Sequence, residues 1–210
     1  MNWRVPEYDT KTLDYALNEW SVKSKYIISL TKSQRTVVQA GGNVGVFPVG
    51  LSGYFDSVYT FEPVEDNYKC LVENIKDYPN ITALNCGLSY KTQGASIKYA
   101  APNNSGAIRL EENGSLNLIP LDKMNLSNVD LLWLDIEGFE YKALLGAKRL
   151  LEENKPIVVL ENNGLIHDYP EERRGRGSNA FRKIMKEEFN YCLDKTMMRD
   201  DIYYYADYIQ

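Results

Sequence analysis

Three acidic residues come directly after apolar runs of the sequence, and this position makes them the first candidates for chemistry. The runs lie at residues 58–61, 129–134 and 157–160, and the acids that follow them are Glu62, Asp135 and Glu161. Short apolar runs of this kind are typical of strands buried on both faces. The carboxyl ends of such strands meet at one crevice in an open α/β sheet, so we expect the three carboxylates to face a common ligand. The plainer alternative for any single one is an acid that caps a helix.

A glycine-rich turn, AGGNVG at residues 40–45, follows a first strand-like run and leads into an apolar helix expected at about residues 44–53. Glycine lets the backbone turn sharply and approach a ligand closely, and the amide groups at the start of the helix then face a polar or negatively charged group. Glu62 lies about twenty residues beyond the turn, where a carboxylate can bind a ribose diol. The segment predicts a nucleoside-cofactor site. Nicotinamide dinucleotides and S-adenosylmethionine are both candidates, and a tight turn without a ligand is the alternative.

Composition limits the class of protein. The chain has 210 residues, of which 44% are hydrophobic, enough for one well-cored domain. Its net charge of −5 argues against general nucleic-acid binding, which needs a basic face. Its cysteines, Cys70, Cys86 and Cys192, form no CxxC pair and suit a reducing compartment. We find no signal peptide and no apolar run long enough for a membrane span, so we expect a cytoplasmic protein.

The elements around the candidate residues alternate between strand and helix patterns. This alternation predicts an α/β fold with a doubly wound, mostly parallel sheet. We expect a single domain over residues 1–210. It begins with a helical cap at 1–34, for which a packing role and a role as a lid over the cofactor are both open. Short strand runs at 89–120 predict a β-rich insertion that covers the ligand cleft.

Two tyrosine-rich runs, at residues 190–197 and 202–209, predict an antiparallel C-terminal hairpin at one edge of the sheet. We place its turn at Arg199, Asp200 and Asp201.

Four segments resemble the FkbM group of S-adenosylmethionine-dependent methyltransferases. They are VVQAGGNVGVF at 37–47, VYTFEPVEDNY at 58–68, IPLDKM at 119–124 and LLWLDIEGFEYKALLGA at 131–147. The last is the most distinctive, because it is similar to the family's IKIDVEG-x-E signature. The resemblance covers roughly residues 36–161 and implies a Rossmann-like class I methyltransferase with a seven-stranded sheet. The leading helix and the closing hairpin fit that fold and do not fit a dehydrogenase.

One residue departs from the family pattern. The family usually has Asp where this chain has Gln39, and that carboxylate helps to hold the amino-acid end of the cofactor. Glutamine keeps an acceptor but loses the charge that would face the cofactor's ammonium group, a loss of about 1–2 kcal/mol for a charge-assisted contact. Weaker binding, a compensating acid elsewhere and a binding module that has lost catalysis are the three explanations.

The resemblance and the strand ends together assign candidate roles. The turn and Gln39 would hold the amino-acid end, Glu62 the ribose, and Asn85 or Cys86 the adenine, while the insertion closes over the cofactor. The complete set of predicted cofactor-binding residues is Gln39, Gly41, Gly42, Asn43, Gly45, Glu62, Pro63, Asn85, Cys86, Asn104, Ser105 and Asp135.

Catalysis of methyl transfer needs alignment of the acceptor and removal of its proton. The candidate bases are Asp135, Glu137 and His167, the one histidine of the chain. Asp135, Glu161 and Asn162 also form an oxygen-ligand set suited to Mg²⁺ or Ca²⁺, similar to that of catechol-type O-methyltransferases. The alternative is that these groups hydrogen-bond loops and bind no metal.

The resemblance points to O-methylation of a small-molecule or saccharide hydroxyl. A non-catalytic S-adenosylmethionine-binding module is the main alternative, and a nicotinamide oxidoreductase and a nucleic-acid methyltransferase are disfavoured. Arg173, Arg174 and Arg176, in a polar loop, are candidates to bind a phosphate or a sugar acid on the acceptor. The sequence leaves open whether the protein forms a homo-oligomer.

Overall fold

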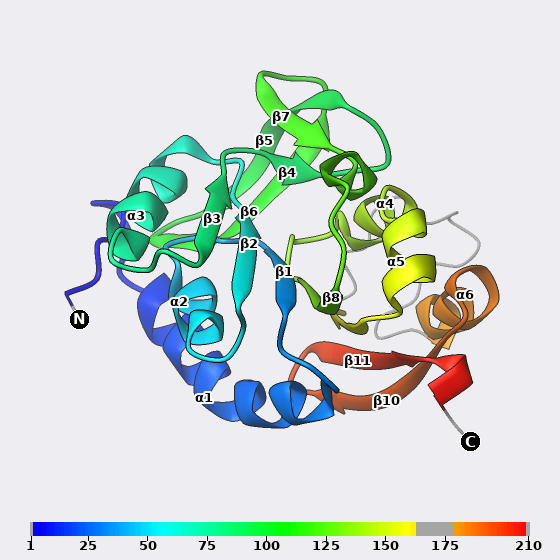
Figure 1. Cartoon of the computed structure of the whole chain (residues 1–210). Helices are drawn as coiled ribbons and strands as arrows, with labels where there is room; N and C mark the ends of the chain where they lie inside the picture. The colour runs from blue at the N-terminus through cyan, green and yellow to red at the C-terminus, as the bar shows by residue number, and fades with distance from the viewer. Residues whose placement is uncertain (1, 163–178, 209–210) are drawn as a thin grey trace.

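The computed structural model describes residues 2–162 and 179–208, and within them a seven-stranded sheet forms the centre of the molecule (Figure 1). In spatial order its strands are β10 (Tyr191–Met197), β11 (Asp200–Tyr205), β9 (Ile157–Glu161), β8 (Val129–Leu134), β1 (Thr36–Ala40), β2 (Ser57–Phe61) and β3 (Ile81–Leu84). Neighbours from β9 to β3 pair in parallel, whereas β11 runs antiparallel to both β9 and β10. The predicted doubly wound sheet is confirmed, and the hairpin joins it with its second strand inside and its first strand at the edge.

Both faces of the sheet are buried, which explains why its strands read as continuous apolar runs. On one face, Val37 packs with residues of α1 (Thr12–Leu30) and α2 (Val46–Ser52). On the other, Val38 packs with residues of α4 (Glu140–Leu145), α5 (Lys148–Asn154) and α6 (Asn179–Phe189). Successive side chains of a strand point to opposite faces, so β1 alone contributes to both cores. A further helix, α3 (Glu65–Ile75), connects β2 to β3.

A second, four-stranded sheet confirms the predicted β-rich insertion. Its order is β4 (Gly87–Leu88), β7 (Leu116–Ile119), β5 (Gln93–Ala101) and β6 (Asn104–Glu112). The two long strands, β5 and β6, form an antiparallel hairpin that reaches from the rest of this sheet toward α1 (Figure 1). Short 3-10 helices follow β7 and β11, at Leu121–Met124 and Ala206–Tyr208.

Helix α1 is fixed at three points along its length. At its start, Asp9 accepts hydrogen bonds from the amides of Lys11 and Thr12. In its middle, Trp20 lies so close to α2 that a Cβ added at Gly50 would be 2.4 Å from the ring. Further on, the buried ammonium group of Lys23 lies 2.8 Å from Asp200 Oδ2.

The hairpin turn differs from the prediction. Asp200 and Asp201 are the first residues of β11 and are buried, so the turn consists of Met198 and Arg199. The reason is that both acids have partners elsewhere in the fold. Asp200 pairs with Lys23, and Asp201 accepts hydrogen bonds from Arg182 of α6.

Within the described ranges, none of the helices combines the length and the apolar character that crossing a membrane requires.

Candidate functional site

A cavity of about 480 Å³ lies at the carboxyl ends of β1, β2, β8 and β9. It is bounded on the opposite side by the first turns of α1 and by β6, and Arg199 from the hairpin turn also lines it. The volume is within the range typical of sites for small molecules and cofactors. Strands that lie apart in the sequence therefore deliver their terminal residues to one pocket, as the sequence predicts for Glu62, Asp135 and Glu161.

The glycine turn after β1 is shaped by contact with the neighbouring strand end. Gly41 has a φ of +87°, and a Cβ on it would lie 1.9 Å from the carbonyl oxygen of Asp135. Glycine is required there for both reasons. The amides of Gly41 and Gly42 donate to the carbonyl of Phe61, at 3.1 and 2.9 Å. The end of β2 therefore already uses these two amides.

Gln39 is buried below this turn, and its amide group has partners at both ends. Its Oε1 accepts a hydrogen bond from the Thr60 hydroxyl at 2.7 Å, and its Nε2 donates to the Gly41 carbonyl at 2.9 Å. Glutamine supplies the donor that the Gly41 carbonyl uses, which an ionised aspartate lacks. In this chain, Gln39 holds the shape of the turn.

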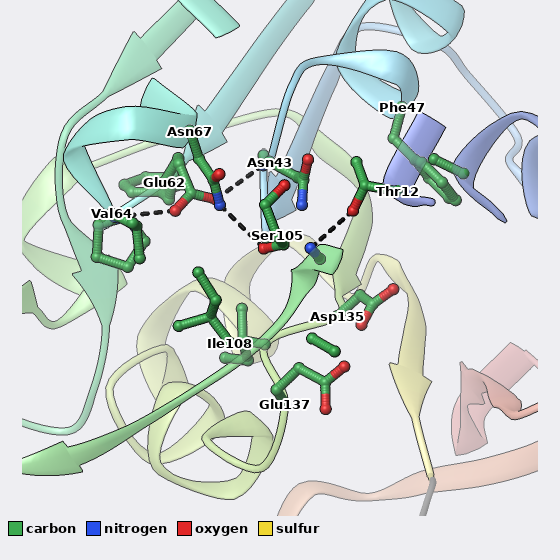
Figure 2. Close-up of a pocket in the computed structure, with 18 of the residues that line it drawn as sticks. Thr12, Asn43, Phe47, Glu62, Val64, Asn67, Ser105, Ile108, Asp135 and Glu137 are labelled. Carbon is green, nitrogen blue, oxygen red and sulfur yellow. Dashed lines mark hydrogen bonds between the residues drawn. The ribbon is translucent and has the colours of Figure 1, made fainter. Parts of the chain in front are cut away.

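Glu62 directly follows β2 and forms the polar centre of one end of the pocket (Figure 2). Its Oε2 accepts from the amide of Asn43 at 2.8 Å and its Oε1 from the amide of Val64 at 2.9 Å. Burial raises the pKa of Glu62 to about 7, against the lowering effect of these hydrogen bonds. Each oxygen keeps a second lone pair, so the carboxylate can still accept from a ligand that carries two hydroxyl groups.

Asn67 of α3, which the sequence interpretation missed, lies beside Glu62 (Figure 2). Its Nδ2 donates to the carbonyl of Ser105 at 3.1 Å, while its buried Oδ1 has no hydrogen-bond partner among the described residues. A buried acceptor of this kind is a candidate for a ligand contact. Its position on the inner face of the helix after Glu62 is the signal that could have found it.

The β5–β6 hairpin and the start of α1 close the pocket on the opposite side. The Thr12 hydroxyl accepts from the amide of Gly106 at 2.7 Å and donates to Asn104 Oδ1 at 2.9 Å. Asp9 accepts from the amide of Ser105. Asn104 and Ser105 thus line the pocket as predicted for the insertion, and α1 takes part in covering it as well as in packing.

The other end of the pocket is acidic. Oxygen atoms of Asp135, Glu137 and Glu161 lie within 4.8 Å of one another. Burial raises the pKa of Asp135 well above its usual range, and the neighbouring Glu161 adds to the effect. Burial likewise raises the pKa of Glu161, and Glu137 contributes. Like charges this close in a partly dry site favour holding a proton or binding a cation.

Glu140 supports the turn that carries this cluster. Its carboxylate accepts from the amide of Ile136 at 3.0 Å and from the amide of Gly138 at 3.0 Å, and it is 1% exposed. Glu140 has this role, whereas Glu137 lines the pocket.

The structure gathers most of the predicted residues. Those that line the pocket are Gln39, Gly41, Gly42, Asn43, Glu62, Pro63, Asn104, Ser105, Asp135, Glu137 and Glu161. Their chemical roles remain predictions. His167 lies outside the described residues, as do Arg173, Arg174 and Arg176.

Four predicted residues lie elsewhere. Gly45 faces Leu71 of α3. Asn85 donates to the main-chain carbonyl of Glu62 at 3.0 Å, and Cys86 belongs to the core, where burial raises the pKa of its thiol to about 11. Asn162 donates to Asp201 Oδ2 at 2.7 Å. The structure therefore does not place these four residues in the lining of the pocket.

The sequence and the fold were compared with those of known proteins, and the family match includes the glycine turn. The sequence matches the family model described as the methyltransferase FkbM domain over residues 39–191. Among curated proteins, no sequence matches this chain significantly.

Several solved structures have a similar fold. The methyltransferase FkbM from Methylobacillus flagellatus KT shares 20% identity with a TM-score of 0.56, and the match covers 95% of this chain and 55% of that one. This chain thus spans about half the length of that protein. Magnesium protoporphyrin IX methyltransferase (ChlM) from Synechocystis PCC 6803, solved with bound SAM, shares 14% identity with a TM-score of 0.52, covering 91% of this chain and 78% of that one.

A third likeness is to SMU.1697c from Streptococcus mutans in complex with SAH, at 10% identity and a TM-score of 0.53, covering 87% of this chain and 94% of that one. Identities this low show the fold, which is that of the class I methyltransferases. Because the family model extends over residues 39–191, from the glycine turn to the start of β10, the chain belongs to the FkbM methyltransferase family.

Proposed function

We propose that this protein transfers a methyl group from S-adenosylmethionine to a hydroxyl group of a small molecule or a saccharide. The observation that carries the proposal is the pocket itself. One end holds Glu62 in a hydrogen-bonded frame suited to a ribose diol, and the other holds Asp135 among groups that favour its protonation. A cofactor placed between them would present its methyl group toward the acidic end.

The reaction follows from that placement. The acceptor oxygen attacks the methyl carbon, the carbon–oxygen bond forms as the carbon–sulfur bond breaks, and the sulfonium becomes the neutral thioether of S-adenosylhomocysteine. The proton of the hydroxyl passes to Asp135. Only the ionised form of Asp135 can accept this proton, and its raised pKa makes that form a stronger base than an exposed aspartate. The adjacent Glu137 is the second candidate for this role.

Binding of S-adenosylhomocysteine is the first test, by calorimetric titration with NADH as the control ligand. We expect micromolar binding of S-adenosylhomocysteine and none of NADH. Glu62→Gln should weaken the binding, whereas Glu65→Gln, on the exposed face of α3, should not. Binding of NADH alone, or equal binding by both variants, would overturn the cofactor assignment. A panel of sugar and small-molecule hydroxyl acceptors then tests turnover.

The binding module without catalysis is the second candidate, and Gln39 is the observation that favours it. Both ends of its amide are used within the protein, so it offers no charge to the ammonium group of the cofactor. In this case the protein would bind S-adenosylhomocysteine but transfer no methyl group to any acceptor of the panel.

A further inference from the structure

We propose that Asp135, Glu137 and Glu161 form a binding site for one divalent cation of the Mg²⁺, Mn²⁺ or Ca²⁺ type. Binding of the ion stands on the geometry of these residues alone. Its role in the reaction rests on the proposed methyl transfer. The set differs from the one that the sequence predicts, because Glu137 replaces Asn162.

The three carboxylates are close enough to share one ion. One oxygen from each lies within 4.8 Å of those of the other two. Calcium holds its oxygen ligands at about 2.3–2.6 Å, so oxygens bound to one calcium ion are at most about 5 Å apart. The corresponding limit for magnesium, with ligands at about 2.0–2.1 Å, is about 4 Å, so the smaller ion needs the carboxylates to move closer together. Asp135 and Glu161 come from the ends of the adjacent strands β8 and β9, which fixes their spacing through the sheet.

Glu161 provides a separate indication that a ligand belongs there. Its side chain is 4% exposed. Its Oε1 lies 3.5 Å from Arg199 Nε, whereas the buried Oε2 has no hydrogen-bond partner among the described residues. A buried carboxylate oxygen without a partner is costly. A proton shared with Asp135 would satisfy it, and a coordinated cation would do so while both carboxylates stay ionised.

The turn after β8 brings Glu137 to the cluster. Glu137 has a φ of +52°, in the left-handed region that non-glycine residues rarely adopt, and the following Gly138 has a φ of +113°. Glu140 holds this conformation through the amides of Ile136 and Gly138. Figure 2 shows Asp135 and Glu137 extending from this turn on the same side of the pocket. Such conformations persist where the surrounding structure enforces them, and they cluster at functional sites.

Charge and ligand type favour a hard divalent ion. Glu19 of α1 lines the same end of the pocket, so four carboxylates gather there. Arg199 approaches Glu161, and Arg109 Nε lies 3.8 Å from Glu137 Oε2. Glu19 is also paired with Lys23 Nζ at 3.3 Å, so three cationic groups face the four carboxylates, and a small excess of negative charge is left when all four are ionised. Carboxylate oxygens without histidine or cysteine select Mg²⁺, Mn²⁺ and Ca²⁺ over zinc.

In the proposed reaction the ion would bind the oxygen of the methyl acceptor. Three carboxylate ligands leave coordination positions for water or for an acceptor oxygen. A hydroxyl group bound there becomes more acidic and is held in place for attack on the methyl carbon. With the ion bound, Asp135 is one of its ligands and a weak base, so the proton of the hydroxyl would pass to solvent water.

Titration of the purified, ligand-free chain with Mn²⁺, followed by electron paramagnetic resonance, tests the site without any assay of activity. We expect one ion to bind with a dissociation constant on the order of 1 mM or lower. Glu161→Gln should weaken binding at least about tenfold, since it removes one ligand. Glu65→Gln, which removes an exposed acid outside the pocket, is the matched control and should bind as the unaltered chain does.

Circular dichroism and the titration with S-adenosylhomocysteine establish that each variant is folded. The absence of saturable Mn²⁺ binding in the unaltered chain, or an equal affinity in the Glu161 and Glu65 variants, would overturn the site. If S-adenosylhomocysteine binds in that case, the proposed function stands and only the ion site fails. If Mn²⁺ binds as expected but S-adenosylhomocysteine does not, the ion site stands and the proposed function fails.

Discussion

The two ends of the pocket are built in opposite ways. Around Glu62, both carboxylate oxygens have backbone partners, and Gln39 below the turn is satisfied on both sides. Around Asp135, carboxylates crowd together and Glu161 leaves a buried oxygen without a partner among the described residues. At the first end the carboxylate is held by backbone amides, and the buried acceptor without a partner among the described residues is a neutral amide oxygen, Asn67 Oδ1. The second end gathers negative charge, which a proton or a cation would balance. Binding and chemistry should therefore respond to different substitutions.

The sharpest test of this difference is Asp135→Asn, which keeps the shape of the side chain and removes its basicity. Turnover should fall by about 10²- to 10⁴-fold, the usual contribution of a general base. Affinity for S-adenosylhomocysteine should stay within about threefold, because ribose and turn contacts are untouched. Single-turnover kinetics and calorimetry measure the two quantities. An equal loss in both would remove the distinction between the two ends.

Gly41→Ala tests whether the turn is as rigid as its contacts indicate. The added Cβ would lie 1.9 Å from the Asp135 carbonyl oxygen in a backbone of positive φ. We expect the free energy of unfolding to fall by about 3 kcal/mol or more, measured by urea denaturation. Gly53→Ala is the control. Gly53 has a φ of −76°, and the nearest atom to its added Cβ lies 3.7 Å away, so little change is expected. Similar losses in the two variants would contradict the role of the turn.

Glu62→Gln should show the reverse of the Asp135 variant. The neutral side chain loses one acceptor and the charge that strengthens the ribose contacts, so affinity for S-adenosylhomocysteine should fall about tenfold to a hundredfold. The maximal rate at saturating cofactor should change far less. Calorimetry with a parallel rate measurement decides the point, and an unchanged affinity would place the ribose elsewhere.

The same carboxylate predicts a pH dependence. With a pKa of about 7 in the ligand-free protein, Glu62 is ionised above that pH and protonated below it. Ribose hydroxyls donate to the ionised form, so the affinity for S-adenosylhomocysteine should reach its maximum by pH 8. Below pH 7 it should decrease with falling pH, by at most about tenfold per pH unit. The stability of the folded protein depends on pH in the opposite direction to the ligand affinity. The unfolded carboxyl, with its lower pKa, loses its proton first, so this group lowers the stability of the ligand-free protein as pH rises from 4.5 through about 7. Calorimetry between pH 5.5 and 8 measures the affinity, and a flat profile in the unaltered chain would show that Glu62 does not contact the ligand.

The smallest expected effect concerns the cover of the pocket. Thr12→Val removes the hydroxyl that joins α1 to Asn104 and Gly106. The loss of about 1 kcal/mol should weaken binding of S-adenosylhomocysteine on the order of fivefold. Thr10→Val, at an exposed position just before the helix, provides the comparison. Hydrogen exchange at the amide of Gly106 should become faster in the Thr12 variant alone.

The sequence predicts the sheet, the insertion and the strand ends that form the pocket, because these depend on apolar patterning and on a local turn. It does not predict the partners of buried polar groups. Asp200 and Asp201 look like turn residues until Lys23 and Arg182 are placed beside them. In the sequence, Gln39 reads as the loss of a charged group, but in the structure its amide oxygen accepts a hydrogen bond from the Thr60 hydroxyl. Such partners lie far away along the chain, and only the packed fold brings them together.

The buried pair of Lys23 and Asp200 has a consequence for how the chain acquires its fold. Helix α1 leaves the ribosome early with one counter-charge for its lysine, Glu19 at 3.3 Å, but the closer partner, Asp200, is absent until residue 200 has been synthesised. A nascent chain that ends before that point would have to bury the ammonium group without Asp200 or leave the helix undocked, and the second outcome costs less. The helix that helps to cover the pocket therefore docks late, so the site is completed after most of the sheet has formed.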